Sequence, residues 1–321
     1  MKLFIELLVF AGVLAVVSVT HAETPLVIGG FDTERSGHIS FPAGDYFSQA
    51  RASLSTSLGP VVFKSFPTLT YENLDGLDIV VLAPGTSHST DAPPLSASEQ
   101  NALRQYALAG GGVVILADNY SYSTGALAEE TALLAPFGIA GYGTLQNWNW
   151  ATVSNPENHA VTSGRFGNVA EFSQFFPGAI TQVGPWSHAL ATNNLGIALV
   201  VIESGAMGDD SGRVAVYSDG NSFADDANYG AYTQNQILFL NTMDWVRRTV
   251  RRPRLLIEKC VSQTVVSWST NSTGFRLLSS PRLGSTAEWS HATNAVTIMG
   301  PNNTITLDSP EQALFFKLVN P

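Results

Sequence analysis

Apolar runs alternate with amphipathic stretches through the first 250 residues of the chain. The run at 113–117 follows a Gly-Gly-Gly turn and is hydrophobic at every position, which is typical of a strand buried on both faces of a parallel sheet. Further strands are predicted at 25–31, 61–66, 77–83, 196–202 and 213–218. Helices are predicted over 46–58, 96–108 and 233–250, and another is expected to begin near Ser123.

This alternation of strands and helices predicts an α/β fold. We expect a doubly wound, mostly parallel sheet with right-handed connections, in which 61–66 lies at an edge. Ser96 and Glu99 form a capping-box pattern at the start of one helix. The pattern loosens over 136–185, where irregular excursions or short edge strands are expected, and 205–212 is typical of an exposed loop or hairpin tip.

The pattern changes after Pro253. Short alternating runs, separated by Asn, Ser, Gly and Pro, predict strands without an intervening helix. Such spacing is typical of a small antiparallel β-sandwich. We therefore expect an α/β domain over 23–250 and a β-sandwich module over 251–321.

Residues 1–22 resemble a secretory signal peptide. Lys2 supplies a basic start, 7–19 is almost wholly apolar, and Thr20-His21-Ala22 offers small residues for cleavage. Glu6 is unusual in such a segment, so an uncleaved membrane anchor is the alternative. No later segment has the roughly 18 apolar residues that a membrane span needs, so no span is expected after signal removal. We expect a bacterial protein that is secreted, periplasmic or bound at the cell surface.

Composition narrows the classes of partner. Hydrophobic residues make up 45% of the chain and charged residues 13%, and the net charge is −10. Because nucleic-acid binding requires clustered Lys and Arg, we expect no nucleic-acid partner. The arginines at 247–254 suit a helix end followed by a linker. Cys260 is the only cysteine, which excludes an intramolecular disulfide and a zinc site made of several thiolates.

Polar residues follow the predicted strands, where open α/β sheets bind their ligands. The candidate ligand-binding residues are Asp32, Thr86, Ser87, His88, Asp118, Asn119, Tyr120, Asp219 and Asn221. His38 also lies on a strand-end loop. The candidate catalytic residues are Asp118, His88 and His159, although a structural role is favoured for His159.

Other chemistries remain as alternatives. Ser121 and Ser123 lack the G-x-S-x-G pattern of a serine nucleophile, and Ser123 suits a helix N-cap better. No cofactor and no metal site is expected. A cation site is the alternative, built from strand-end groups: Asp32, His88, Asp118, Asp219, Asp225 and Asp226.

An aromatic, amide-rich segment lies within the loosely patterned region. Its residues are Tyr142, Asn147, Trp148, Asn149 and Trp150. If buried, they would pack an excursion against the sheet, which is the interpretation we favour. If exposed, they would suit stacking on sugar rings.

Several segments resemble the class I glutamine amidotransferase-like superfamily, and among its members most resemble the non-catalytic or uncharacterised branches of exported bacterial proteins, whose fold is flavodoxin-like. These are 74–82, 95–116, 159–164 (HAVTSG), 213–223 and 241–245. The resemblance covers about 25–250 and implies a catalytic cysteine at the turn after the central strand, activated by histidine. Here that turn reads Ala117-Asp118-Asn119-Tyr120-Ser121, without a thiol, so glutamine hydrolysis is not expected. The tail resembles small β-sandwich modules of secreted bacterial proteins.

The expected function is therefore a non-enzymatic ligand-binding or scaffolding role, with a glycan, a small ligand or a protein as partner. A carbohydrate-directed hydrolase that uses strand-end Asp and His residues is the first alternative, by resemblance to trehalose-utilisation-like domains. A purely structural surface protein is the second.

Overall fold

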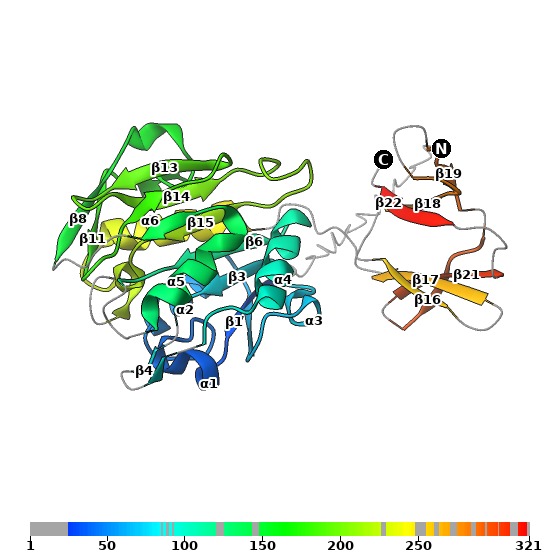
Figure 1. Cartoon of the computed structure of the whole chain (residues 1–321), viewed down its shortest axis with the longest axis horizontal. Coiled ribbons are helices and arrows are strands. Elements are labelled where there is room, and N and C mark those ends of the chain that lie inside the picture. The colour runs from blue at the N-terminus through cyan, green and yellow to red at the C-terminus, as the bar shows by residue number, and fades with distance from the viewer. Residues whose placement is uncertain are drawn as a thin grey trace, which may run out of the picture.

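The chain forms an α/β part and a β part (Figure 1). The computed structural model describes residues 25–84, 86–87, 90–91, 93–119, 125–142, 148–225, 229–247, 255–259, 263–269, 275–283, 287–292, 294–300, 302–308 and 314–319. The expected signal peptide (1–22) and Cys260 lie outside them. Within the described residues, no helix has both the length and the apolar character needed to cross a bilayer.

Five parallel strands form one half of the main sheet. In spatial order they are β2 (Val61–Phe66), β1 (Leu26–Phe31), β3 (Ile79–Leu82), β6 (Gly112–Leu116) and β15 (Val214–Tyr217). The predicted central strand, β6, pairs in parallel with β3 on one side and with β15 on the other. The prediction of a buried strand with parallel neighbours is thus confirmed, and β2 lies at the edge as expected.

The other half of the sheet is antiparallel. It continues from β15 through β14 (Ile197–Ile202), β13 (Ser187–Thr192), β8 (Asn149–Val153) and β11 (Glu171–Gln174). In addition, β12 (Ile180–Gln182) pairs with β14, and β7 (Ala140–Tyr142) pairs with β12. The sheet is therefore mixed, and the expectation of a mostly parallel sheet holds only for the half from β2 to β15. The connection from β14 to β15 contains no helix, so the chain returns as a hairpin.

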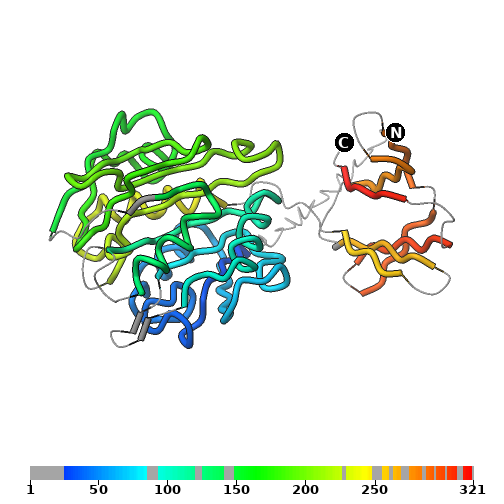
Figure 2. Tube along the Cα trace, viewed as in Figure 1, coloured from blue at the N-terminus to red at the C-terminus, as the bar shows by residue number. Residues whose placement is uncertain are grey.

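Helices cover both faces of this sheet (Figure 2). One face carries α2 (Ser48–Ser57) and α6 (Thr233–Val246), and the other carries α3 (Tyr71–Leu74), α4 (Ala97–Leu108) and α5 (Ala126–Leu134). Successive residues of β6 point to opposite cores, which explains why the whole strand is apolar. The described part of α5 begins at Ala126, with Gly125 before it, and the expected N-cap Ser123 lies outside the described residues.

Shorter elements complete the α/β part. They are α1 (Thr33–Ser36), β4 (Thr86–Ser87), β5 (Thr90–Asp91), β9 (Ser163–Gly164) and β10 (Gly167–Asn168). The described part of the loosely patterned region 136–185 thus contains short strands, as the sequence predicts, together with two 3-10 turns.

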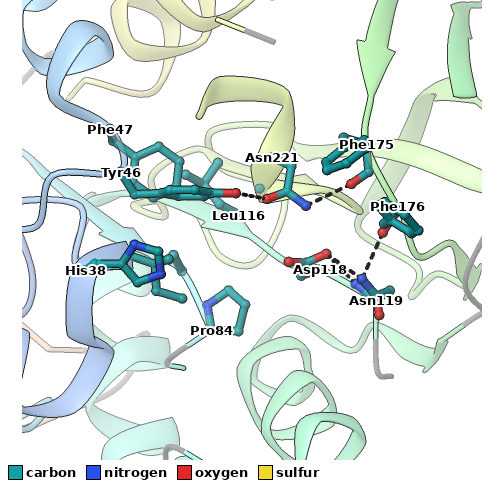
Figure 3. Close-up of a pocket in the computed structure, with 13 residues that line it drawn as sticks. His38, Tyr46, Phe47, Pro84, Leu116, Asp118, Asn119, Phe175, Phe176 and Asn221 are labelled. Carbon is teal, nitrogen blue, oxygen red and sulfur yellow. Dashed lines mark hydrogen bonds between the residues drawn. The ribbon is translucent and has the colours of Figure 1, made fainter. Parts of the chain in front are cut away.

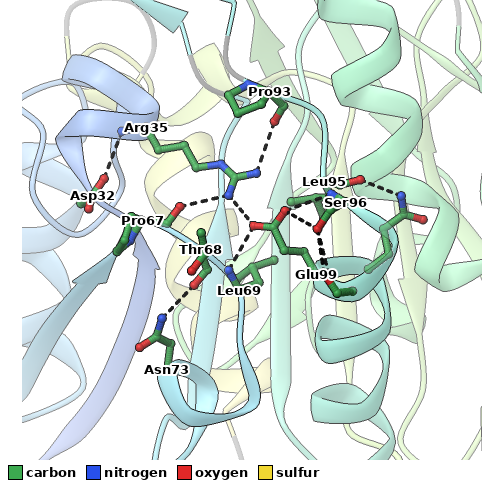
Figure 4. A network of polar contacts seen from close by, with 12 residues as sticks. Asp32, Arg35, Pro67, Thr68, Leu69, Asn73, Pro93, Leu95, Ser96 and Glu99 are labelled. Carbon is green, nitrogen blue, oxygen red and sulfur yellow. Dashed lines mark hydrogen bonds and ion pairs between the residues drawn. The ribbon is translucent and has the colours of Figure 1, made fainter.

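A buried ion pair joins α1 to the first turn of α4 (Figure 4). The side chains of Arg35 and Glu99 are only 8% and 10% exposed. Arg35 also donates to the carbonyl of Pro67 at 3.0 Å. Glu99 accepts from the backbone N–H of Ser96 at 2.9 Å and from that of Leu69 at 3.2 Å, which confirms the predicted capping box. Burial alone would raise the pKa of Glu99, but the hydrogen bonds from Arg35 and Ser96 hold it below its ordinary value.

The β part contains two small antiparallel sheets. One has the order β16 (Leu256–Lys259), β17 (Gln263–Ser269), β21 (Asn302–Asp308), β20 (Thr297–Met299), and the other has β19 (Ser290–His291), β18 (Arg276–Ser280), β22 (Phe315–Val319). Val266, Trp268 and Ile305 from the first sheet share one hydrophobic cluster with Leu277 from the second. The described residues of this part include no helix, in agreement with the sequence pattern.

Candidate functional site

A cavity of about 550 Å³ opens at the carboxyl ends of the parallel strands (Figure 3). The loop after β1, the ends of β3 and β6, the turn after β15 and the segment after β11 all contribute to its wall. Its lining residues are His38, Ile39, Tyr46, Phe47, Ala83, Pro84, Leu116, Asp118, Asn119, Phe175, Phe176, Gly220 and Asn221. Open α/β sheets bind ligands at this end, so the cavity is the candidate site.

Asp118 follows β6 directly and is the one carboxyl group in the described lining. Its Oδ1 accepts from the backbone N–H of Asn119 at 2.7 Å and from the amide of the same residue at 3.0 Å. Oδ2 receives no hydrogen bond from any described residue. Burial raises the pKa of Asp118 from 3.8 to about 7, although the hydrogen bonds from Asn119 lower it in part. The carboxyl therefore titrates near neutral pH and keeps one oxygen available to a ligand.

Asp219 ends the neighbouring strand β15 but lies wholly buried beneath the cavity wall. Its Oδ2 accepts from the backbone N–H of Phe175 at 2.7 Å and from the hydroxyl of Ser222 at 3.1 Å. Its Oδ1 accepts from the backbone N–H of Asn221 at 2.9 Å. Burial and the nearby charge of Asp118 both raise the pKa of Asp219 well above its usual range. Both oxygens of Asp219 are thus used to hold the wall in place.

Two asparagines fix the segment after β11 against the strand ends. Asn119 donates to the carbonyl of Phe176 at 2.9 Å, and Asn221 donates to the carbonyl of Phe175 at 2.8 Å. Phe176 has a left-handed backbone, with φ of 55°, which is strained for a bulky side chain. The two amides help to hold this conformation, so that both phenylalanine rings line the cavity.

The opposite side of the cavity comes from the loop between β1 and α2. Figure 3 shows His38 and Tyr46 on this side, across from Phe175 and Phe176. The Tyr46 hydroxyl donates to Oδ1 of Asn221, and its ring packs against His38 with 5.1 Å between ring centroids. Asp225 positions this loop, because its carboxylate accepts from the first backbone N–H groups of α2.

The chemistry of the lining is polar but nearly uncharged. Neither Lys nor Arg occurs among its described residues, so no cation is present to pair with a phosphate or carboxylate ligand. Aromatic rings, two amides, a phenol, an imidazole and one carboxyl group suit a neutral molecule that carries hydroxyl groups.

The structure brings together some of the predicted site residues. Asp118, Asn119 and Asn221 line the cavity, as does His38. Asp32 instead caps α1 by accepting from the backbone N–H of Arg35 at 3.0 Å. Thr86 and Ser87 form the short strand β4. The remaining candidates lie outside the described residues: His88, Tyr120, Ser121, Ser123, Asp226 and Asn147.

His159 lies outside the cavity lining. Its Nε2 is 2.8 Å from Oε1 of Glu203, and its Nδ1 accepts from the backbone N–H of Val161 at 3.1 Å. The ring also packs edge-on against Trp245, with 4.9 Å between centroids. These contacts fit the structural role favoured from the sequence.

Trp148 and Trp150 are 54% and 45% exposed, so the interpretation that they are buried packing residues is wrong. Each contacts one aromatic neighbour, Phe175 and Tyr232 respectively, and leaves the rest of its ring open. As for the alternative cation site, no group of three His, Cys, Asp or Glu side chains suited to a metal ion occurs in the described part of the chain.

The sequence does not identify Tyr46, Phe47, Phe175 and Phe176 as site residues. The only sequence feature that could have indicated these four site residues is their apolar character outside the predicted strands. The Phe175-Phe176 pair before Pro177 is the clearest example. Their partners lie far away along the chain, so contact with Asn119 or Asn221 becomes visible only in the fold.

Comparison with known proteins gives weak similarities. No family model matches the chain, and no curated protein matches it. Similar solved structures include a GMP synthase-like protein from Thermoplasma acidophilum (TM-score 0.43, 11% identity, covering 70% of this chain and 94% of that one). A glutamine amidotransferase from Methylobacillus flagellatus (0.40, 10%, 71% and 97%) and a β-galactosidase from Rahnella sp. R3 (0.40, 11%, 89% and 41%) are also similar. Similarities of this size assign neither a family nor an activity.

Proposed function

We propose that the α/β part is an amidotransferase-like domain that lacks the catalytic thiol and binds a small neutral ligand. The order β2-β1-β3-β6-β15 supports a flavodoxin-like topology, because the parallel strands of that fold follow the order 2-1-3-4-5. The turn after β6, the region where the enzymes carry their cysteine, contains no thiol in its sequence from Ala117 to Ser121. Thiol chemistry therefore has no nucleophile at this position.

The ligand we propose is a monosaccharide-sized, uncharged molecule with several hydroxyl groups. The observation that carries this proposal is the cavity itself, with aromatic walls, a free carboxyl oxygen on Asp118 and no cationic side chain in its described lining. Aromatic rings can pack against the C–H face of a sugar, while the carboxyl and hydroxyl-bearing groups bind its edge. A volume of about 550 Å³ lies within the usual range for small-molecule sites.

Glycan hydrolysis is a second candidate, because a carboxyl group with a pKa of about 7 can act as a general acid. Glycosidases generally need two carboxyl groups that flank the scissile bond. Asp219 is the nearest partner for Asp118, but it is wholly buried and both of its oxygens accept internal hydrogen bonds. Binding without hydrolysis is therefore the function we favour.

Two further parts of the proposal concern the rest of the chain. Residues 1–22 support export to the periplasm, the cell surface or the medium. The hydrophobic cluster common to both small sheets supports a β-sandwich module in the β part.

Isothermal titration calorimetry with glucose, galactose and mannose tests the proposed function. The 6-phosphate of each sugar is titrated separately for comparison. At pH 8 we expect at least one neutral sugar to bind more tightly than its phosphate. Asp118→Asn should weaken that binding about tenfold, since a hydrogen bond to a charged group is lost. Asp209→Asn is the matched control, because Asp209 is exposed and lies outside the lining.

Preference for the phosphates, or no binding of any of these sugars, would contradict the proposal. Release of nitrophenol from p-nitrophenyl glycosides, lost in Asp118→Asn, would instead establish the hydrolase.

A further inference from the structure

We propose that a glycan chain, rather than a free monosaccharide, is the natural ligand, and that it leaves the cavity over an exposed tryptophan surface. This surface consists of Trp148, Asn149, Trp150, Asn194 and Tyr232. The inference rests on the proposed function, because the terminal sugar of the glycan would occupy the cavity beside Asp118.

The two tryptophans are unusual in their exposure. The chain has six tryptophans, and only Trp148 and Trp150 leave about half of the side chain open to solvent. Rings left exposed gain little of the stabilisation that burial would give, so a pair of them two positions apart indicates a binding surface.

Neighbouring rings hold both tryptophans in place. Trp148 packs on Phe175 with 4.5 Å between ring centroids, and Trp150 contacts the edge of Tyr232 at 5.2 Å. Each indole is therefore held on one side and open on the remainder. A ligand that stacks on such a ring loses little side-chain entropy of the protein, since the ring is already ordered.

Phe175 connects this surface to the cavity. Its ring lines the cavity and also contacts Trp148, while Trp150 follows two positions later in β8. A ligand that extends from the cavity past Phe175 therefore meets Trp148 first and Trp150 next. A monosaccharide confined to the cavity would reach neither of them.

The polar groups of the surface favour a neutral chain. Asn149 donates its amide to Oδ1 of the exposed Asn194, and no residue of the surface carries a charge. Amides beside open aromatic rings offer hydrogen bonds for sugar hydroxyl groups and a flat face for the C–H side of the ring. The net charge of −10 makes an anionic polymer an unfavourable occupant.

Titration with oligosaccharides of increasing length tests this inference. The probes are glucose, galactose and mannose and their β-1,4-linked oligomers from the dimer to the hexamer. We expect the affinity for the best series to rise at least tenfold between the monomer and the tetramer. Trp148→Ala and Trp150→Ala should each lower the affinity for the tetramer about tenfold and leave the affinity for the monomer unchanged.

Tyr71→Ala is the matched control, because Tyr71 is an aromatic residue of α3 that is 48% exposed and outside the tryptophan surface. Circular dichroism of each variant confirms that it is folded. If monomers bind but length brings no gain, or if the tryptophan variants match Tyr71→Ala, the inference is wrong while the proposed function stands. If no sugar of any length binds, both are wrong. If the tryptophan variants turn a dimer into a monomer in size-exclusion chromatography with light scattering, the surface is a contact between copies of the chain.

Discussion

Replacing Asp118 with asparagine should change how the stability of the protein depends on pH. In the folded protein, burial raises the pKa of this carboxyl to about 7, whereas its ordinary value is 3.8. Folding therefore favours the protonated form. The free energy of unfolding of the wild type should fall as the pH rises from 3.8 to 7, because the unfolded chain loses its proton first.

The size of this effect follows from the two pKa values. Each pKa unit is worth 1.36 kcal/mol, so the difference between 3.8 and about 7 corresponds to a loss on the order of 4 kcal/mol. Asparagine has the same shape, can accept the same hydrogen bonds from Asn119 and does not ionise. The Asp118→Asn substitution also removes the charge that raises the pKa of Asp219. This second effect likewise increases the stability of the variant relative to the wild type as the pH rises.

Urea unfolding of both proteins at pH 5, 6, 7 and 8, followed by tryptophan fluorescence, measures the difference. We expect the advantage of Asp118→Asn to grow by about 1 kcal/mol per pH unit up to pH 7 and then to level off. Asp209→Asn is the control, because Asp209 lies in an exposed loop outside the cavity lining. An advantage that stays constant from pH 5 to 8, or that shrinks as the pH rises, would refute the argument for a buried carboxyl.

Two further substitutions test how the site is supported. Glu99→Ala should lower the free energy of unfolding, measured in urea, by about 3 kcal/mol, because it leaves the Arg35 guanidinium buried without its carboxylate. The double variant Arg35→Met/Glu99→Leu should recover much of the lost stability. An equal loss in the single and the double variant would contradict this argument. Asp225→Ala should cost about 1 kcal/mol by removing the cap of α2, whereas Asp209→Ala, in an exposed loop, should change the stability by less than about 0.5 kcal/mol. No loss in Asp225→Ala would mean that the cap does not hold the loop that carries Tyr46.

The parallel half of the sheet could be predicted because local sequence determines it. A run such as 113–117 has hydrophobic residues on both faces, and that pattern alone indicates a central strand. The direction of β14 could not be predicted in this way. It is equally apolar, but it pairs in antiparallel fashion with β15 because the connection between them is a hairpin rather than a helical crossover.

The candidate site was predictable only in part, for a related reason. Asp118, Asn119 and Asn221 lie two to four residues after the ends of β6 and β15, so their place at the sheet edge follows from the strand pattern. Phe175 and Phe176 reach the cavity through hydrogen bonds with residues more than 40 positions away along the chain.

Hydrogen–deuterium exchange of the full chain, with and without the best-binding sugar, tests the central claim most directly. A thiol-free cavity that binds a neutral sugar predicts slower exchange in peptides that contain 116–119, 175–176 and 219–221, and recovery of the sugar intact. Protection confined to other peptides, such as those of 255–319, would contradict it.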